Sequence, residues 1–293
     1  MLGRLQRAGA GPAGGRGVLA AGVVLALAGG LTGCGGGPGD EPADAQAIRA
    51  AYDTTIGAES AKVSVRGETK TGGKGPAGSI KGHGVIDFAN EATAVTMQLP
   101  QGDVETRTIG QVLYEKVAEQ QRAQVPGNKP WVKIDLGAVA EKQFGADAAN
   151  KQSGPTDPAQ LLGYLRGVSG KVRDLGTAKV GGDETTHYKT KVDLRTAAKH
   201  LGPQEAQSTE QLQQRLGTRH LPMEVWLDDE QRVRRLSATM PLAAAPTGGQ
   251  PGAEVTVTED LFDFGAELDV GPPPKGDTAD VTDTILQRTP AGG

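Results

Sequence analysis

The residue with the clearest chemical setting is Cys34, the single cysteine of the 293-residue chain. It follows Leu31, Thr32 and Gly33, and this order of an aliphatic residue, two small residues and a cysteine matches the bacterial lipobox. In that motif the thiol receives a diacylglyceryl group before the preceding segment is removed. The sequence therefore predicts lipidation at Cys34. The alternative is a chance cysteine behind an ordinary signal peptide.

The segment before Cys34 has the features of a secretory signal. Arg4, Arg7 and Arg16 give it a positive start without carboxylates, and residues 18–28 form an apolar run too short for a comfortable membrane span. We expect residues 1–33 to be the signal peptide and residues 34–43 a flexible tether. The protein is then anchored on the outer face of the cytoplasmic membrane. Removing residues 1–33 would leave 260 residues, with 28 basic against 35 acidic side chains, a net charge of −7.

Other residue types that support catalysis or metal binding lack the required spacing. Ser169 is not in the Gly-x-Ser-x-Gly elbow of a hydrolase, and the Gly72–Gly75 segment has no Ser or Thr after its lysine, so we interpret it as a turn. A single cysteine excludes an internal disulfide and a thiolate zinc cluster. The sequence predicts no catalytic residue, no metal and no cofactor, and hence no enzyme. No histidine pair has metal-ligand spacing among His83, His187, His200 and His220.

Two acidic groups could bind a cation. The first is the run Asp228-Asp229-Glu230, and the second comprises Asp260, Asp263 and Asp269. Neither has the glycine-spaced ligand loop of a calcium site, so we favour solvated turns. The formal net charge of −4 for the whole chain gives no electrostatic reason to bind nucleic acid.

Four segments have the apolar spacing or the capping residues of helices. In the first, Ile48, Ala51, Tyr52 and Thr55 share one face. In the third, Asp157 is a candidate N-cap followed by Pro158, and Gly170 is a candidate stop. The expected helices cover residues 44–56, 138–149, 157–169 and 203–216.

Between these helices the apolar residues alternate with polar ones, as in strands with one buried face. Turn residues at 71–76, 89–91 and 228–231 join neighbouring strands as hairpins. Trp226 alternates outward from Val225 and Leu227, and we expect it to pack against a helix or to lie exposed at a membrane interface. The expected strands include residues 63–65, 95–99, 112–114, 131–134, 171–180, 185–194, 223–227, 236–240 and a final one at 255–261, before Pro272-Pro273-Pro274.

This order of elements predicts an α+β fold. Long alternating strands interrupted by a few helices favour a single curved antiparallel sheet with helices covering its concave face. No internal linker suggests a second domain. We therefore expect one folded domain at residues 44–286 and a disordered tail at 287–293.

Three stretches resemble the actinobacterial LppX/LprG lipoprotein family, whose wider relatives are the LolA-like carriers. They are Asp157-Pro158-Ala159-Gln160-Leu161-Leu162, Leu221–Glu230 and Val233–Leu236, with Val281-Thr282-Asp283 as a weaker similarity. The resemblance implies an incomplete barrel whose apolar cavity holds the acyl chains of a lipid or glycolipid, and an envelope transporter as a partner. The insertions at residues 72–75 and 204–214 depart from the pattern.

Apolar residues on one face of the expected strands and helices are our candidate cavity wall. The same residues could pack solidly against the helices, because periodicity does not distinguish a filled core from a lined cavity. Two hypotheses follow: a membrane-anchored lipid-binding module, and an envelope lipoprotein with a filled core that scaffolds or regulates a protein partner. The candidate wall residues are Val63, Val65, Ile86, Val95, Met97, Leu99, Leu161, Leu165, Tyr188, Val225 and Leu236.

Overall fold

The structure is a computed structural model that describes residues 43–71, 74–99, 102–144, 158–201, 203–241 and 253–288. The chain divides into residues 1–40 and a compact unit of residues 41–293, and all described residues belong to the second. Cys34, the expected signal peptide, Asp157 and the greater part of the tether lie outside the described residues. The description below concerns the second unit alone.

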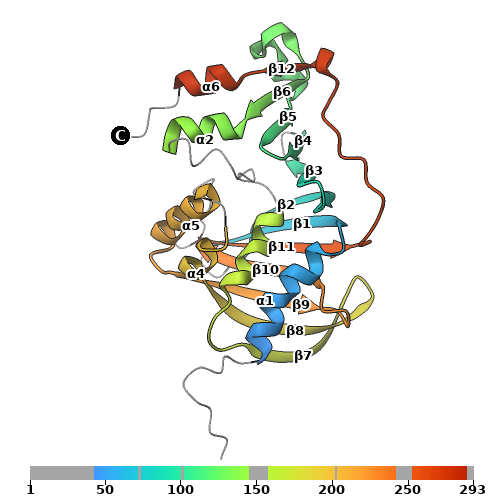
Figure 1. Ribbon diagram of the computed structural model, residues 1–293, viewed down its shortest axis with the longest axis vertical. Helices are drawn as coiled ribbons and strands as arrows, with labels where there is room; N and C mark the ends of the chain where they lie inside the picture. Colours follow the sequence, from blue (N-terminus) through green and yellow to red (C-terminus); the bar gives the residue numbers. More distant parts are fainter. Residues whose placement is uncertain are drawn as a thin grey trace, which may run out of the picture. The chain divides into compact units, whose positions relative to one another are not determined.

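A single open sheet of twelve strands organises this unit (Figure 1). The order across the sheet is β12-β6-β5-β4-β3-β2-β1-β11-β10-β9-β8-β7. The α+β class and the single curved sheet are thus confirmed. The strands are β1 (Ser60–Thr71), β2 (Lys74–Asp87), β3 (Ala92–Leu99), β4 (Gly102–Ile109), β5 (Val112–Lys116), β6 (Trp131–Asp135), β7 (Arg173–Val180), β8 (Asp183–Asp193), β9 (His220–Leu227), β10 (Val233–Pro241), β11 (Ala253–Phe262) and β12 (Thr278–Asp280).

Helices occupy most of the remaining described chain, and three short 3₁₀ turns precede β6 or β12. The expected helix at 203–216 has the predicted bounds, and the one expected from Asp157 ends in a 3₁₀ turn at Gly167, before Gly170. The helices are α1 (Ala43–Ile56), α2 (Leu136–Phe144), α3 (Pro158–Gly163), α4 (Leu194–Ala198), α5 (Pro203–Leu216) and α6 (Thr282–Arg288); the 3₁₀ turns are η1 (Glu119–Gln124), η2 (Pro126–Asn128), η4 (Tyr164–Gly167) and η6 (Lys275–Asp277).

Helix α4 was not predicted, because Leu194 continues the alternation of strand β8. The structure ends β8 one residue earlier, at Asp193. The carboxylate of Asp193 accepts hydrogen bonds from the backbone N–H groups of Arg195 and Thr196, at 3.0 and 3.1 Å. This is an N-cap, which satisfies donors that the first helical turn cannot pair. A capping side chain therefore converts an apparent strand end into a helix start.

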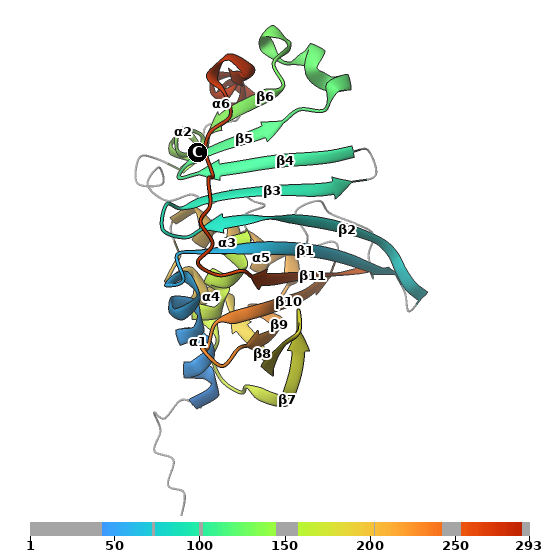
Figure 2. The same ribbon diagram turned by 90° about the vertical axis from the view of Figure 1, so that its right-hand side faces the viewer.

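The prediction that β11 is the final strand is wrong. Residues after Phe262 run along the outer side of the sheet and return to it as β12, which pairs in parallel with β6 (Figure 2). On the way, the Arg107 guanidinium donates a hydrogen bond to the carbonyl of Gly271 at 3.0 Å. The segment that contains the proline run therefore crosses the sheet from β11 to β12, and pairing resumes after the prolines. It also makes the sheet mixed, with one parallel pair among antiparallel ones.

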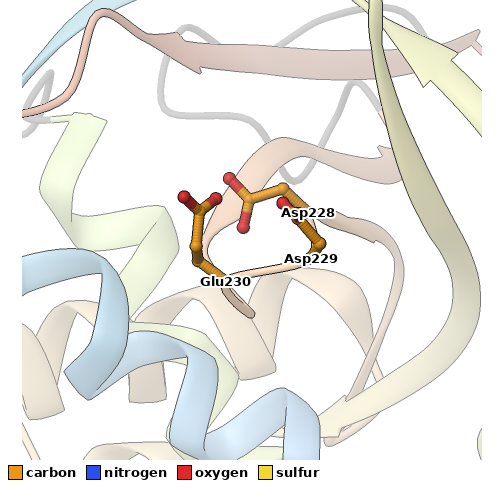
Figure 3. A group of neighbouring side chains, drawn as sticks. All are labelled: Asp228, Asp229 and Glu230. Carbon is orange, nitrogen blue, oxygen red and sulfur yellow. The ribbon is translucent and has the colours of Figure 1, made fainter.

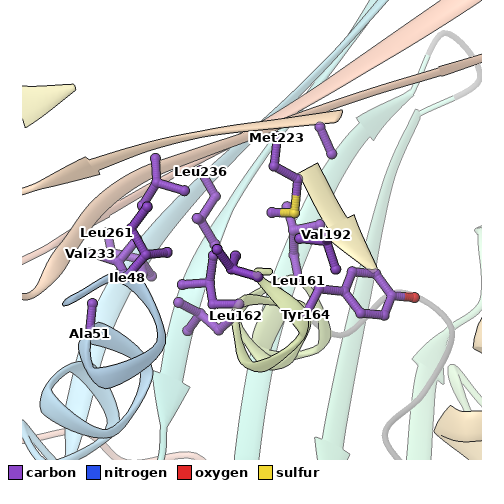
Figure 4. Close-up of a cluster of buried hydrophobic side chains, with 14 of the residues drawn as sticks. Ile48, Ala51, Leu161, Leu162, Tyr164, Val192, Met223, Val233, Leu236 and Leu261 are labelled. Carbon is purple, nitrogen blue, oxygen red and sulfur yellow. The ribbon is translucent and has the colours of Figure 1, made fainter. Parts of the chain in front are cut away.

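The core lies between the helices and the strands β1 to β3 and β8 to β11. Leu161 and Leu162 of α3 and Ile48 of α1 point toward Leu236 and Leu261 on the sheet (Figure 4). Ile48, Ala51 and Thr55 are buried, as the spacing of α1 predicts. The hydroxyl of Thr55 also accepts a hydrogen bond from the backbone N–H of Val233 at 2.9 Å, which fixes α1 to β10.

Glycines allow strand β3 to lie close against β2. A Cβ atom added to Gly84 would lie 2.2 Å from the carbonyl oxygen of Ala94 and 2.8 Å from the Cα of Val95. At Gly82 it would lie 2.3 Å from the sulfur of Met97. Atoms of β3 therefore already fill the space above these glycines. A side chain at either position would have to displace β3.

We expect Gly84→Ala to lower the free energy of unfolding by about 1–3 kcal/mol, because the added methyl group meets backbone atoms that cannot move aside. Urea unfolding followed by circular dichroism measures the change. Gly78→Ala is the matched control, since no atom lies within 4 Å of its added Cβ. Equal stability of the two variants would contradict the close contact between β2 and β3.

Candidate functional site

The sheet brings all the predicted wall residues of its strands to one face. Val63 lies opposite Gly84, which lies opposite Val95, so the three share one transverse row. In the next row Val65 lies opposite Gly82, and Gly82 opposite Met97. On the other side of β1 the row continues through β11, Leu236, Val225 and Tyr188. The alternation in the sequence therefore predicts residues that lie on the same face of the sheet, even on strands far apart in the chain.

The predicted wall residues divide into two groups by burial. The first group lies in the packed core beneath the helices, while side chains of the second are half-buried. The packed residues are Val63, Ile86, Val95, Leu161, Leu165, Val225 and Leu236, and the half-buried ones are Val65, Met97, Leu99 and Tyr188.

Further apolar side chains, half-buried except for the exposed Ile80, extend the second group across six neighbouring strands, from β10 to β4. Val257 lies opposite Gly67, and Gly67 lies opposite Ile80, which is 40% exposed. We call this surface the half-buried band. Its members are Val65, Ile80, Met97, Leu99, Val104, Met240, Val255 and Val257. Sequence periodicity suggested part of it, but Ile80 was missed because glycines dominate β2.

One carboxylate interrupts the apolar rows. Glu259 on β11 is 6% exposed and lies opposite Val65 on one side and Leu236 on the other. Along its own strand it alternates with Val257 and Leu261 on the same face. Sequence reasoning missed this residue, although the alternation places it inward. A buried acid here gives an otherwise apolar face one strongly polar group.

Tyr188 lies at the end of the same row, beyond Val225. Burial raises the pKa of its hydroxyl, and the negative charges of Asp174 and Asp44 raise it further. A hydrogen bond with Thr186 opposes these effects but does not outweigh them. The phenol therefore stays neutral near neutral pH and offers a hydrogen-bonding group beside an apolar wall.

The opposite, convex face carries polar and charged residues. Trp226 lies there against the ring of His187, with 4.0 Å between centroids, and not against a helix as expected. The guanidinium of Arg235 lies 5.6 Å from the Trp226 ring. Burial alone would raise the pKa of Glu224, yet hydrogen bonds from Lys189 and His187 lower it. Neighbouring strands thus hold the half-buried Trp226 in a polar network, and the expected packing against a helix is wrong.

The acidic run Asp228-Asp229-Glu230 forms the turn between β9 and β10 (Figure 3). Its carboxylate oxygens lie within 4.8 Å of one another, and it lines a pocket of about 570 Å³ with residues of strands β7 and β8. Asp228 accepts hydrogen bonds from the backbone N–H and the guanidinium of Arg232, at 2.8 and 3.0 Å. The expected turn is found, and its one buried acid is engaged by arginine.

We expect Asp228→Asn to reduce the free energy of unfolding by about 1.5–3 kcal/mol, because a buried charge-assisted hydrogen bond is lost. Thermal and urea unfolding provide the measurement. Asp229→Asn serves as the control, since Asp229 is exposed in the same turn. If both variants matched the unchanged protein, Asp228 would have no structural role in the turn.

The remaining candidate residues are dispersed. Within the part of the chain that the structure describes, no other group of three histidine, cysteine or acidic side chains is close enough to hold a metal ion. Asp260 forms an ion pair with Arg235 and Asp263 one with Lys62. Among the described helices, none has both the length and the apolar character needed to cross a bilayer.

Comparison with known proteins finds similar structures only. No protein-family model matches the chain, and no curated protein does. The lipoprotein LppX of Mycobacterium tuberculosis has 14% identity and a TM-score of 0.44, over 77% of this chain and 99% of LppX. LprF from Mycobacterium bovis has 14% identity and a TM-score of 0.43, over 80% and 99% of the two chains. A LolA superfamily protein from Nitrosomonas europaea has 11% identity and a TM-score of 0.29, over 77% and 94%.

LppX gives its name to the family that the sequence resembles, and the LolA-like proteins are the wider relatives of that family. The likeness concerns the curved sheet.

Proposed function

We propose that this protein is a membrane-anchored lipoprotein that binds lipid acyl chains against the half-buried band of its concave face. The observation that carries the proposal is the band itself, a set of partly exposed apolar side chains on the same face as the core, of which Val65, Met97 and Met240 also pack against the core. Apolar side chains in this position gain from being covered by hydrocarbon, at roughly 25 cal/mol per Å² removed from water.

The dimensions of the band suit an acyl chain. Six strands from β10 to β4 are separated by five spacings, about 24 Å in total. The hydrocarbon of one bilayer leaflet is about 15 Å thick, half of the membrane core. A chain of that length can lie across several strands. Moving it from the bilayer to the band exchanges one apolar environment for another, so loading and release can be nearly balanced.

Carriage or presentation of a lipid or glycolipid across the cell envelope is the finer part of the proposal. The lipobox at Cys34 supports an anchor on the outer face of the cytoplasmic membrane, and the glycine-rich residues after it support a short flexible tether. A carrier in that place needs a donor or acceptor, for which an envelope transporter is the proposed partner. Glu259 and Tyr188 supply polar groups that a headgroup or a hydroxylated chain can contact.

The filled core beneath the helices favours the second candidate, a scaffold that regulates a protein partner. Seven of the eleven predicted wall residues lie in that packed core. Lipid binding and scaffolding therefore make different demands on the half-buried band. Only the first requires the band to accept hydrocarbon.

We expect Leu99→Arg to abolish lipid loading while the fold persists, because Leu99 is half-buried at the margin of the core and an arginine there places a charge in the acyl-chain path. Native mass spectrometry with lipid extraction, after expression in an actinobacterial host, measures the bound lipid. Gln98→Arg is the matched control, since Gln98 is exposed on the convex face of the same strand.

Undiminished lipid in the folded Leu99→Arg variant would remove Leu99 from the site. A stable unchanged protein that is empty after purification and also refuses offered lipids would overturn the lipid-binding proposal and favour the scaffold.

For the anchor, we expect Cys34→Ser to shift the protein from the membrane fraction to a form without covalently bound lipid, because the serine hydroxyl cannot replace the thiol in lipidation. Metabolic labelling with a fatty acid, followed by fractionation, measures both effects. Retained label on the serine variant would place the lipid elsewhere in the chain.

A further inference from the structure

We infer that the concave face selects lipids whose polar end carries hydroxyl groups and no phosphate, and that Glu259 is the residue that rejects anionic lipids. This inference rests on the proposed function, since it names the class of lipid that the half-buried band takes. Glu259 borders the band: Val65 lies directly opposite it, and Val257 lies two residues away on the same face of β11. A lipid that covers the band therefore comes close to this carboxyl group.

Polar and apolar side chains are separated along the two transverse rows that pass through Val257 and Glu259. The row through Glu259 begins at Tyr188 on β8, and the row through Val257 begins at Thr190 on the same strand. The polar side chains of both rows thus lie on β8 and β11. This separation gives the ligand a direction, with its polar end toward Glu259 and its hydrocarbon toward β4. The positions of these rows on β1 to β4 are Val65, Gly67, Ile80, Gly82, Met97 and Val104.

The polar groups of these rows include no cation. Their polar side chains are Glu259, Tyr188 and Thr190, and the described pairings bring no lysine or arginine into either row. A phosphate that leaves water needs a cation or several donors to compensate for its lost hydration. An ionised Glu259 repels a phosphate, and a protonated Glu259 offers one hydrogen-bond donor without a positive charge. In either state, these rows disfavour an anionic headgroup.

Arginines on the helices over the core do not supply the missing charge. The guanidinium of Arg49 on α1 donates a hydrogen bond to the carbonyl of Val168 at 2.6 Å. That of Arg166 on η4 donates to the carbonyl of His200 at 3.2 Å and pairs with Asp53 at 3.4 Å. Both groups are therefore engaged within the protein. The other two basic residues of these helices, Arg195 and Arg215, are exposed.

The same rows suit a polar end that carries hydroxyl groups. Thr190 is 4% exposed, and its hydroxyl oxygen has no hydrogen-bond partner among the residues that the structure describes. A buried hydroxyl without a partner has lost its hydrogen bonds to water, so a ligand hydroxyl that bonds to it compensates for this loss. Tyr188, two residues away on β8, offers a second hydroxyl, and Glu259 offers acceptor oxygens. Hydroxyl and carboxyl side chains together match glycerol or sugar hydroxyls.

The test offers the protein two lipids with identical acyl chains, dioleoylglycerol and dioleoylphosphatidylglycerol, in equal amounts in the same vesicles. The full chain carries Cys34→Ser, so that no covalently attached lipid contributes. After the protein is separated from the vesicles, its bound lipids are extracted and quantified by mass spectrometry. We expect the parent to prefer the diacylglycerol by about 30-fold, and Glu259→Gln to lower that preference by about tenfold, because the variant keeps the size of the side chain and removes its charge.

Glu254→Gln is the matched control, since Glu254 is exposed on the convex face of the same strand. It removes the same charge and should keep the preference of the parent. Circular dichroism establishes that both variants are folded. If Glu259→Gln does not fold, the preference of the parent between the two lipids still decides whether the concave face rejects phosphate.

The outcomes separate this inference from the proposed function. Uptake of neither lipid by the parent would overturn lipid binding and this inference with it. Equal uptake of both lipids by the parent would overturn the inference and leave lipid binding standing. An unchanged preference in folded Glu259→Gln, or the same loss of preference in Glu254→Gln, would overturn the assignment of Glu259 as the selecting residue.

Discussion

The structure depends on a mismatch between the area of one sheet and the area that its helices can cover. Twelve strands at about 4.8 Å spacing make a surface roughly 50 Å across, whereas each helix is about 10 Å wide. Helices α1, α3 and α4 contribute to one core with strands β1 to β3 and β8 to β11. Beyond that core, Leu99 of β3 and Val104 of β4 are half-buried apolar side chains on the same face. A sheet of this width therefore creates both a packed core and a surface that needs a cover.

Close contact between β2 and β3 joins the central strands β1, β2 and β11 to the strands β3 to β6. Because Gly82 and Gly84 have no Cβ atom, Met97 and Val95 of β3 can lie directly over them. On the convex face, the segment after Phe262 runs from β11 to β12. Arg107 donates a hydrogen bond to the carbonyl of Gly271 in this segment, and β12 then pairs with β6. The strands of the half-buried band are therefore held by close packing at Gly82 and Gly84 on the concave face and by the segment after Phe262 on the convex face.

Local patterns were sufficient for most elements because alternation and capping act within a few residues. The β9–β10 hairpin and helix α5 follow from such patterns, and so does the shared face of Val63, Val95 and Leu236. Long-range pairing was not predictable in the same way. Nothing local in Thr278–Asp280 indicates that three residues will pair in parallel with β6, 147 positions earlier. The degree of burial was not predictable either. Val95 and Met97 occupy equivalent positions in the alternation of β3, but only Val95 is buried.

Besides Ile80, sequence reasoning missed two departures from the expected residue pattern, and such departures are where function is most readily accommodated. Glu259 lies between Val65 and Leu236, where an aliphatic residue would satisfy every local rule. Arg66 and Lys81 face each other where an opposite charge would stabilise the pair. Both breaks lie on or beside strand β1, one concave and one convex. Strand β1 thus lies beside the buried carboxylate of β11 on the apolar face and carries the cation Arg66 on the convex face.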